Sequence, residues 1–261
     1  MMRDYCLIQL TDLHLQPDPA ALLHGVNTEQ RLQQALASLA GTEADALVLT
    51  GDLAHIGNVA AYNRLIDYLS PVTCPAYWLP GNHDDAALMQ QLATGSLRQK
   101  QFRLGNWQIL LLDTTAEPDG VGGGEMAAGE LAWLQQQLAQ AEQDSSIDHL
   151  LLAMHHHPVP VGSAWQDRIM LRNAGPFWQQ AEQSRKLRAV IFGHVHQDNQ
   201  LQHQSVALYS SPSVAAQFEP RCEQFTLGPE GPGYCCYRLS ADGRVERRLV
   251  RLTELAQAPA G

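Results

Sequence analysis

Residues 81–84 read Gly-Asn-His-Asp, and they stand just behind Ala76–Leu79, a short apolar run that predicts a β-strand. Polar residues occupy the same place after four other apolar runs of strand length. These groups are Thr11-Asp12-Leu13-His14 after Tyr5–Leu10, Gly51-Asp52 after Ala46–Thr50, His155-His156-His157-Pro158 after His149–Met154, and Gly193-His194-Val195-His196 after Ala189–Phe192. The sequence therefore predicts a sheet whose strands end in Asp, Asn and His side chains.

Segments with a helical hydrophobic period separate these strands. Helices are predicted from about Thr28 to Leu39 and over Val59–Leu69, Asp85–Ala93, Gly129–Ala141 and Pro176–Ser184, with one more strand at Gln108–Leu112. After Gly193 the helical period stops, and short strands are predicted at Val206–Tyr209, Ser213–Phe218, Gln224–Leu227, Tyr234–Leu239 and Val245–Leu252. The pattern indicates a single α/β domain over residues 1–252, β-rich from about residue 200, and a frayed tail over 253–261.

Composition narrows the class of protein. The chain has 261 residues, 45% of them apolar, and its 17 basic and 27 acidic side chains give a formal net charge of −10. This apolar content excludes a disordered chain, and the negative charge argues against a broad surface for nucleic acid or anionic lipid. No apolar run approaches the about 18 residues of a membrane span, and the N-terminus lacks a signal-peptide pattern. With five cysteines that show no C-x-x-C spacing, we expect a cytoplasmic protein with free thiols and with neither nucleic-acid nor membrane partners.

The five polar groups are expected to converge, because ligand sites of α/β sheets lie beyond the carboxyl ends of the strands. Each group alone is a weak signal, since Gly-Asp and Gly-Asn are ordinary turn dipeptides. Together they bring imidazole and carboxylate groups to one edge without thiolate, and that donor set suits Fe, Mn, Zn or Co. The sequence therefore predicts a metal centre.

In this order, D-x-H, G-D, G-N-H-D, H-x-P and G-H-x-H resemble the motifs of the calcineurin-like metallophosphoesterases. Stretches without metal ligands are similar to the bacterial class III 3′,5′-cyclic AMP phosphodiesterases: residues 23–28, residues 155–175, and Ser211-Pro212-Ser213 with Gln217-Phe218. The resemblance reaches about residue 252. It implies an α/β fold of four layers, αββα, in which a two-sheet β-sandwich is flanked by helices and the β-rich C-terminal part closes the second sheet.

The resemblance implies two divalent metal ions per chain, Fe²⁺ or Mn²⁺ ahead of Zn²⁺ or Co²⁺. The implied ligands are Asp12, His14 and His196 for one ion, Asn82, His156 and His194 for the other, and Asp52 as the bridge. Among the three consecutive histidines, His156 matches H-x-P and His157 takes the variable position, where it is expected either to support a ligand from behind or to face the substrate. His155 is expected to point to the opposite face of the strand, because successive strand side chains alternate.

Catalysis needs a positive site and an acid. Two divalent cations, two aspartates and a bridging hydroxide leave a net charge of about +1 beside the phosphodiester, so a neutral Asn82 is significant and Asn82→Asp should weaken substrate binding. By resemblance, a metal-bound hydroxide attacks phosphorus and His83 is the catalytic acid that protonates the leaving 3′-oxygen. Asp84 is expected either to orient His83 or to cap the following helix.

Substrate contacts are expected from loops that the resemblance covers. The candidates are Asn82, His83, His157, His24, Asn27, Arg172, Asn173 and His196. Arg172 either pairs with phosphate or braces a loop, and His55 either reaches the rim of the pocket or is a surface residue ahead of a helix. Gly120–Gly124 lies well after its strand, so a flexible loop is expected there rather than a phosphate cradle.

The activity that the resemblance implies is hydrolysis of 3′,5′-cyclic AMP, and of other cyclic nucleotides, to the 5′-nucleotide. One alternative is a phosphodiesterase of the same fold for glycerophosphodiesters, nucleoside polyphosphates or other small phosphodiesters. A protein phosphatase and a non-catalytic scaffold are further alternatives, and competent side chains at every motif position argue against the scaffold. The metal, the preferred base and the oligomeric state stay open, with a homodimer among the alternatives.

Overall fold

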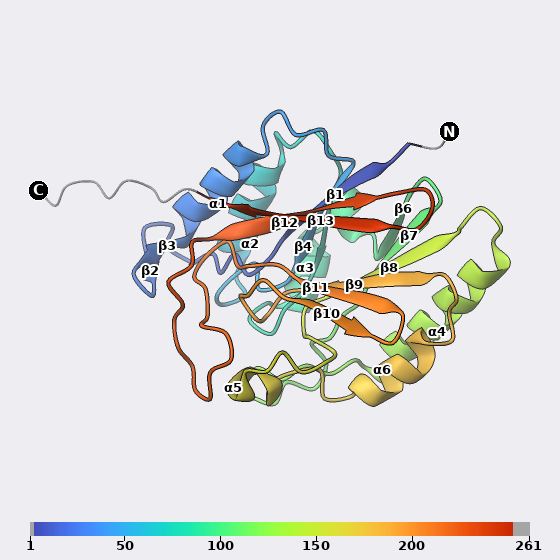
Figure 1. Cartoon of the computed structure of the whole chain (residues 1–261). Helices are drawn as coiled ribbons and strands as arrows, with labels where there is room; N and C mark the ends of the chain where they lie inside the picture. Colours follow the sequence, from blue (N-terminus) through green and yellow to red (C-terminus); the bar gives the residue numbers. More distant parts are fainter. Residues whose placement is uncertain (1–2, 253–261) are drawn as a thin grey trace, which may run out of the picture.

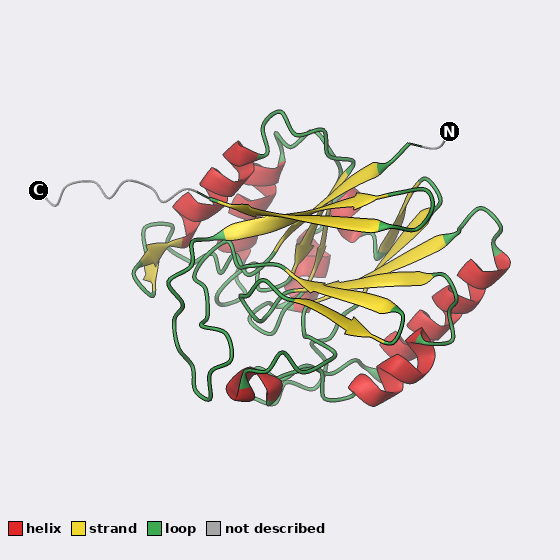
Figure 2. Cartoon of the chain, viewed as in Figure 1, coloured by secondary structure: helices red, strands yellow, loops and turns green. Residues whose placement is uncertain are grey.

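Two sheets facing each other form the centre of the molecule, and the computed structural model describes residues 3–252 (Figures 1 and 2). The first sheet has the order β13-β12-β1-β4-β5, with β1 Tyr5–Leu10, β4 Ala46–Thr50, β5 Ala76–Leu79, β12 Gly233–Leu239 and β13 Val245–Arg251. The second has the order β10-β11-β9-β8-β7-β6, with β6 Gln101–Leu104, β7 Trp107–Leu111, β8 His149–Met154, β9 Leu187–Phe192, β10 Gln200–His203 and β11 Val206–Ser210. A small hairpin pairs β2 Leu22–Leu23 with β3 Val26–Asn27.

Helices lie on the outer faces of both sheets. The first sheet carries α1 Thr28–Ser38, α2 Val59–Leu69 and α3 Ala86–Leu92, and the second carries α4 Ala128–Gln143 and α6 Ala174–Ala181. The short helix α5 Ala164–Asp167 and the 3₁₀ turn η1 Gly95–Arg98 lie in connections. None of the helices within residues 3–252 is long and apolar enough to cross a membrane.

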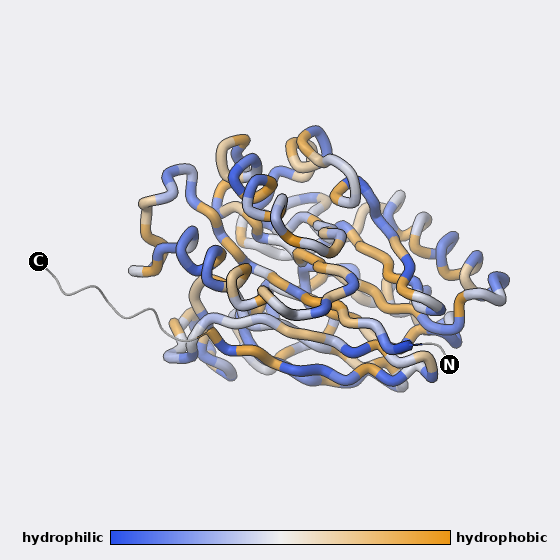
Figure 3. Tube along the Cα trace, turned by 90° about the horizontal axis from the view of Figure 1, so that it is seen from above, coloured by the Kyte–Doolittle hydropathy of each residue, from blue (hydrophilic) through white to orange (hydrophobic). Residues whose placement is uncertain are grey.

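Three hydrophobic cores separate the four layers. In β1, Ile8 packs with the helical residues Leu32 and Leu65, whereas its neighbour Leu7 packs with Ile191 of the second sheet. Successive side chains of one strand thus enter different cores, as the alternation of a strand requires. Figure 3 shows the apolar strands running through the interior, with the more polar helices at the outside. The expected αββα fold class is confirmed.

Neighbouring strands in each sheet run parallel and are buried on both faces, including β5 at the edge of the first sheet. In the first sheet β1, β4 and β5 are parallel, and in the second β7, β8 and β9 are parallel. Burial on both faces explains their nearly continuous apolar sequences. Their carboxyl ends point to one edge of the sandwich, where the polar groups of the sequence follow.

The C-terminal part differs from the prediction in two respects. The segments 213–218 and 224–227 are not strands, but lie in a long loop over residues 211–232 in which Phe218 and Leu227 form an isolated bridge. β10 and β11 extend the second sheet, whereas β12 and β13 pair with the free edge of β1 and so complete the first sheet. The tail predicted over 253–261 lies outside the described residues.

Candidate metal centre

The loops after β1, β4 and β5 meet the loops after β8 and β9 at the edge between the sheets. The backbone N–H of His194 donates to both carboxylate oxygens of Asp12, at 3.2 and 3.1 Å. The preceding Gly193 permits this approach, because a Cβ there would overlap the side chain of Thr11 and the backbone of Thr50. The strand ends therefore come together as the sequence predicted.

Several residues at these strand ends have a left-handed backbone. Positive φ angles between 47° and 69° are found at Asp12, His14, Asp52, His194 and His196. Such a conformation is uncommon outside glycine and costs on the order of 1–3 kcal/mol per residue, so it persists only where the surroundings impose it. Here the sharp turns direct successive polar side chains out of the strands and toward one another.

One group of ligand atoms comes from Asp12, His14 and His196. The Nε2 atom of His196 lies 3.1 Å from Asp12 Oδ1 and 3.2 Å from His14 Nε2, which itself lies 3.7 Å from Asp52 Oδ2. The other ring nitrogen of His196 donates to the carbonyl of Ala216 at 2.7 Å, and this bond fixes the ring with Nε2 toward the group. These atoms are close enough to hold one metal ion.

A second group contains His155, which was expected on the opposite face of the strand. Its Nε2 atom lies 3.4 Å from Asp52 Oδ2 and 3.1 Å from Asn82 Oδ1, and its Nδ1 donates to the carbonyl of Thr50 at 2.8 Å. That expectation was wrong, because β8 ends at Met154 and the alternation of a strand does not extend beyond it. His155 is thus the histidine of the triplet that faces the carboxylate expected to bridge the metals.

His156, the ligand expected from H-x-P, has different partners. Its Nδ1 is paired with Thr114 Oγ1 at 2.7 Å, and its Nε2 is 3.2 Å from the carbonyl oxygen of Gly122. Its ring lies 4.6 Å from that of His194, and His155, His156 and His194 together are close enough to bind an ion. His155 and His156 are therefore two candidates for the histidine ligand of a second metal ion beside His194.

His157 is completely buried and does not line the cavity described below, so of its two alternatives the structure favours the place behind a ligand over contact with substrate. Its Nε2 lies 3.8 Å from Asp167 Oδ1, and its ring packs 5.6 Å from the His194 ring and 6.3 Å from that of Phe192. His157 supports His194 from behind.

The charges of the cluster fit a metal centre. Burial acts to raise the pKa of Asp52, but the charge of His155 outweighs it and holds the pKa of this carboxylate well below its usual value. Burial acts to lower the pKa of His155, and the Asp52 carboxylate raises it to about 9. Burial lowers the pKa of His14 to about 3, so that this imidazole is neutral. Divalent transition ions bind neutral imidazole and ionised carboxylate, so His14 and Asp52 already have the form that binds an ion, whereas His155 is protonated near neutral pH without metal and must release its proton when an ion binds.

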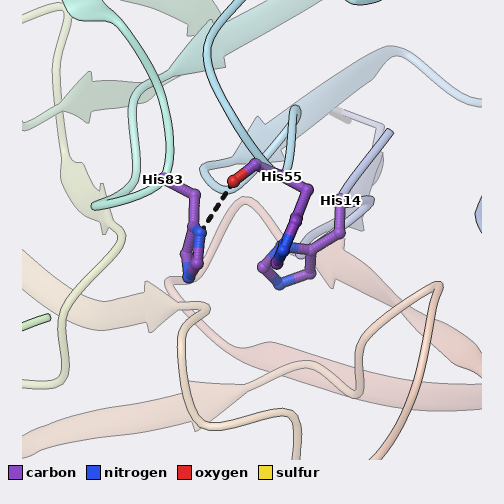
Figure 4. Close-up of side chains that lie close together, drawn as sticks. All are labelled: His14, His55 and His83. Atoms are coloured by element: carbon purple, nitrogen blue, oxygen red, sulfur yellow. Dashed lines mark hydrogen bonds between the residues drawn. The ribbon is translucent and has the colours of Figure 1, made fainter. Parts of the chain in front are cut away.

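His83 lies next to His14 of this cluster, and His55 lies beside both of them (Figure 4). Its Nδ1 donates to the backbone carbonyl of His55 at 2.9 Å, and its backbone N–H donates to Asp52 Oδ1 at 2.9 Å. The rings of His55 and His83 stack at 5.0 Å, and Nδ1 of His55 is 3.5 Å from Nδ1 of His14. Of the two alternatives for His55, the rim of the pocket is therefore correct.

Asp84 neither orients His83 nor caps a helix, so both expectations for it were wrong. Its carboxylate accepts hydrogen bonds of 2.9 to 3.0 Å from three backbone N–H groups in the loops after β4 and β5 and from the hydroxyl of Tyr62. The cap of α3 is the next residue, Asp85. Asp84 fastens the two loops that carry the metal-site residues to each other.

A cavity of about 230 Å³ opens beside the ligand cluster. Four of the residues expected to contact substrate line it: His24, Asn82, His83 and His196. His24 comes from the turn between β2 and β3, which brings an N-terminal hairpin to the mouth of the cavity.

The three other polar residues expected at the substrate have structural partners instead. Arg172 pairs with Asp119 at 3.0 Å and Glu125 at 2.7 Å, which selects the loop-bracing alternative. Asn27 caps α1, and the side chain of Asn173 is bound to the backbone of residue 126. None of the three lines the cavity described above.

The loop Gly120–Gly124 is ordered by Asp119, whose Oδ1 accepts from the N–H groups of residues 121, 122 and 123 at 2.9 to 3.0 Å. These donors are thus engaged and do not cradle a phosphate, although Val121 and Gly122 line the cavity. Sequence reasoning did not assign either of them to the site, nor six other lining residues: Leu23, Trp165, Ile169, Ala216, Phe218 and Phe225. They stand in segments without a regular period. Leu23, Trp165, Ile169 and Phe218 lie in the stretches that resemble the cyclic AMP phosphodiesterases, and that resemblance was the available signal, whereas Phe225 had no signal beyond a large apolar side chain in a loop.

Comparison with known proteins points to one family. A family model described as calcineurin-like phosphoesterase matches residues 7–198. The 3′,5′-cyclic adenosine monophosphate phosphodiesterase CpdA of Escherichia coli (strain K12) is 36% identical over 97% of this chain and 92% of its own length. The enzyme of the same name from Pseudomonas aeruginosa is 34% identical over 95% of this chain and 90% of its own length. A 3′,5′-cyclic-nucleotide phosphodiesterase from Nostoc sp. is 33% identical over 94% and 92%.

Solved structures support the fold. A dimetal phosphatase from Danio rerio superposes with a TM-score of 0.72 over 95% of this chain and 99% of that chain, at 12% sequence identity. At this identity the similarity supports the arrangement of sheets and helices alone.

Proposed function

Because the chain belongs to the calcineurin-like phosphoesterase family, we propose that it is a metal-dependent phosphodiesterase that hydrolyses 3′,5′-cyclic AMP to the 5′-nucleotide. Relatives that match it over nearly its whole length are named for this activity. The observation that carries the proposal is the convergence of Asp, Asn and His side chains from both sheets beside a cavity that His83 also lines.

The cluster supports two metal ions that share one carboxylate. The proposed ligands are Asp12, His14 and His196 for one ion, Asn82, His155 and His194 for the other, and Asp52 for both. His155 takes the place that the sequence assigned to His156, because its Nε2 faces both Asp52 and Asn82. Divalent ions, which we propose to be Fe²⁺ or Mn²⁺, supply a positive field for the phosphodiester and activate water when they are bound.

The chain's own residues supply the proton and the orientation. The bond from Nδ1 of His83 to the His55 carbonyl leaves Nε2 of His83 to carry the second proton of the imidazolium. From the rim of the cavity, that proton can pass to the 3′-oxygen as its bond to phosphorus breaks. Asp52 holds the backbone of His83 in place, and so it joins the acid to the metal cluster.

The test is a substrate panel with the purified, metal-loaded protein. With added Mn²⁺ or Fe²⁺ we expect turnover of cyclic AMP to 5′-AMP, and a chelator should abolish it. Cyclic GMP, a glycerophosphodiester and bis(4-nitrophenyl) phosphate complete the panel. Cleavage of the aryl or glycerol diester with no turnover of either cyclic nucleotide would contradict the proposed substrate, while the family assignment would stand.

We also propose a reducing compartment, the cytoplasm, for this protein. All five cysteines lie within the described residues as free thiols, as is usual in such a compartment. Cell fractionation with an antibody to the chain checks this location.

A further inference from the structure

A group of aromatic rings borders the cavity next to His196. We call Trp165, Phe218 and Phe225 the aromatic wall, because all three line the cavity and contact one another. On the basis of the proposed function, we propose that the aromatic wall binds the nucleobase of a cyclic nucleotide by stacking, and that Phe225 provides the exposed ring.

The aromatic wall is held against a proposed metal ligand. The ring of Phe218 stacks on the ring of His196 at a centroid distance of 4.0 Å and an interplanar angle of 12°. Trp165 and Phe225 then meet Phe218 edge to face at 5.2 and 5.1 Å, and they meet each other at 5.4 Å. A substrate whose phosphate lies at the proposed metal ligands therefore has an aromatic surface within the same cavity.

Three separate segments build this surface. Trp165 belongs to α5, the two phenylalanines belong to the loop over 211–232, and His24 from the β2–β3 turn lies 5.7 Å from Phe225. Figure 1 shows this loop in orange between the β2–β3 hairpin and α5. The convergence of these segments on Phe225 gives its ring a defined place at the mouth of the cavity.

The exposure of Phe225 suits a ligand rather than a core. Its side chain is 49% exposed, although aromatic side chains of this size usually bury most of their surface. The described residues that line the cavity include no lysine or arginine, so no such side chain beside the aromatic wall is available to bind an anionic phosphate. A neutral, flat base matches its apolar chemistry, and stacking of a base on an aromatic ring is typical of nucleotide recognition.

Stacking predicts a particular pattern of substrate effects. Every base has a π-face, so loss of the ring should weaken binding of cyclic AMP and cyclic GMP by similar factors. A cyclic phosphate without a base should not respond. Stacked bases usually contribute enough that loss of the ring raises KM about tenfold, within a range of about five- to a hundredfold.

The experiment compares two substrates and four proteins. The substrates are cyclic AMP and methyl β-ribofuranoside 3′,5′-cyclic phosphate, which carries a methyl group in place of the base. The proteins are the wild type, Phe225→Ala, Phe225→Tyr, and Leu227→Ala as a matched control. Leu227 is 43% exposed in the same loop and does not line the cavity.

For Phe225→Ala we expect a KM for cyclic AMP raised about tenfold, an unchanged kcat and metal content, and an unchanged KM for the methyl riboside. Phe225→Tyr should restore the KM for cyclic AMP, and Leu227→Ala should behave as the wild type with both substrates. A rise in KM for both substrates, or for neither, would overturn the stacking site.

A different result would show that the proposed activity is wrong while the stacking site is still open to test. If the metal-loaded wild type cleaves neither cyclic phosphate, the proposed activity is wrong, and binding of 5′-AMP by calorimetry then decides the stacking site. Weaker binding of 5′-AMP by Phe225→Ala than by Leu227→Ala would support the site. Equal affinities, or no binding to the wild type, would overturn it.

Discussion

His83 is oriented by a backbone carbonyl, and its neighbour Asn82 belongs to the proposed metal site. Because its imidazole is not among the proposed ligands, His83→Ala should keep both metal ions and lose about 10²- to 10⁴-fold in kcat, the usual contribution of a positioned acid. Metal analysis beside steady-state kinetics measures both quantities. A variant that loses metal would show that His83 is a ligand rather than an acid.

His155 and His156 can be separated by metal content. His155 alone of the two faces Asp52, so His155→Ala should bind about one metal ion fewer per chain, whereas His156→Ala should retain both ions. Elemental analysis after dialysis against equal Mn²⁺ concentrations gives the comparison. The reverse result would restore His156 as the ligand.

The stability of the metal-free protein should depend on pH through the ionisation of His155. Its pKa is raised in the folded state to about 9 from 6.5, so the stabilisation from its pairing with Asp52 is fully present below pH 6.5 and is lost as pH rises to about 9. Denaturant unfolding of the chelated protein should show this loss between pH 6.5 and 9. In His155→Asn the fall over that interval should be smaller, and an identical fall in both proteins would contradict the pairing.

At the scale of the element, the site depends on how closely the strand ends approach. A Cβ at Gly193, just after β9, would overlap Thr11 and the backbone of Thr50, so Gly193→Ala should lower the free energy of unfolding by about 1–3 kcal/mol and weaken metal binding. Chemical denaturation and metal titration measure these effects.

Gly129, near the start of α4, is the matched control for Gly193. Apart from its chain neighbours and the backbone of its own helix, no atom lies within 4 Å of a Cβ added there, so Gly129→Ala should leave the free energy of unfolding unchanged or raise it by up to about 1 kcal/mol. Equal behaviour of the two variants would mean that the approach at Gly193 is not tight.

The elements also differ in how well the sequence predicts them. The parallel strands β1, β4, β5 and β8 are confirmed at their predicted bounds, because each is largely buried on both faces and its apolar run is continuous, even in β5 at the edge of the first sheet. The strands β6 and β10, at the two edges of the second sheet, were not predicted: only alternate residues of β6 are buried and no residue of β10 is fully buried, so neither has a continuous apolar run. The segments 213–218 and 224–227 have the apolar content of strands, but two of their large side chains, Phe218 and Phe225, line the cavity.

At the scale of the whole molecule, the proposed metal ligands come from both sheets. Asp12, His14, Asp52 and Asn82 follow strands of the first sheet, whereas His155, His194 and His196 follow strands of the second. Bound ions would therefore hold the two halves of the sandwich together at this edge. Metal that binds only the folded state raises the free energy of unfolding, by about 2.7 kcal/mol per site at a hundred times Kd.

Removal of metal should accordingly lower the stability of the entire domain. We expect the chelated protein to unfold at lower temperature and lower denaturant concentration than the Mn²⁺-loaded protein, and His14→Ala should show a smaller difference. Calorimetry with and without Mn²⁺ measures this coupling. Equal transitions in both states would mean that the ions do not link the sheets.

The sequence by itself determined the chemistry and the approximate place of the site. Apolar runs predicted the central strands, and Asp, Asn and His behind five of them predicted a metal centre at their carboxyl ends, because these are local properties of neighbouring residues. The same local information predicted the family, which the comparisons confirmed.

Only the tertiary structure decided which side chains face one another. It turned His155 toward Asp52, gave Arg172 and Asn173 structural partners, placed β12 beside β1, and brought Phe225 into contact with Trp165. Beyond the end of a strand, the direction of a side chain depends on the turn that follows and on packing against distant segments. Neither follows from the local hydrophobic pattern of the sequence. The types of metal ligand could therefore be predicted from the sequence, but the residues that line the cavity could not.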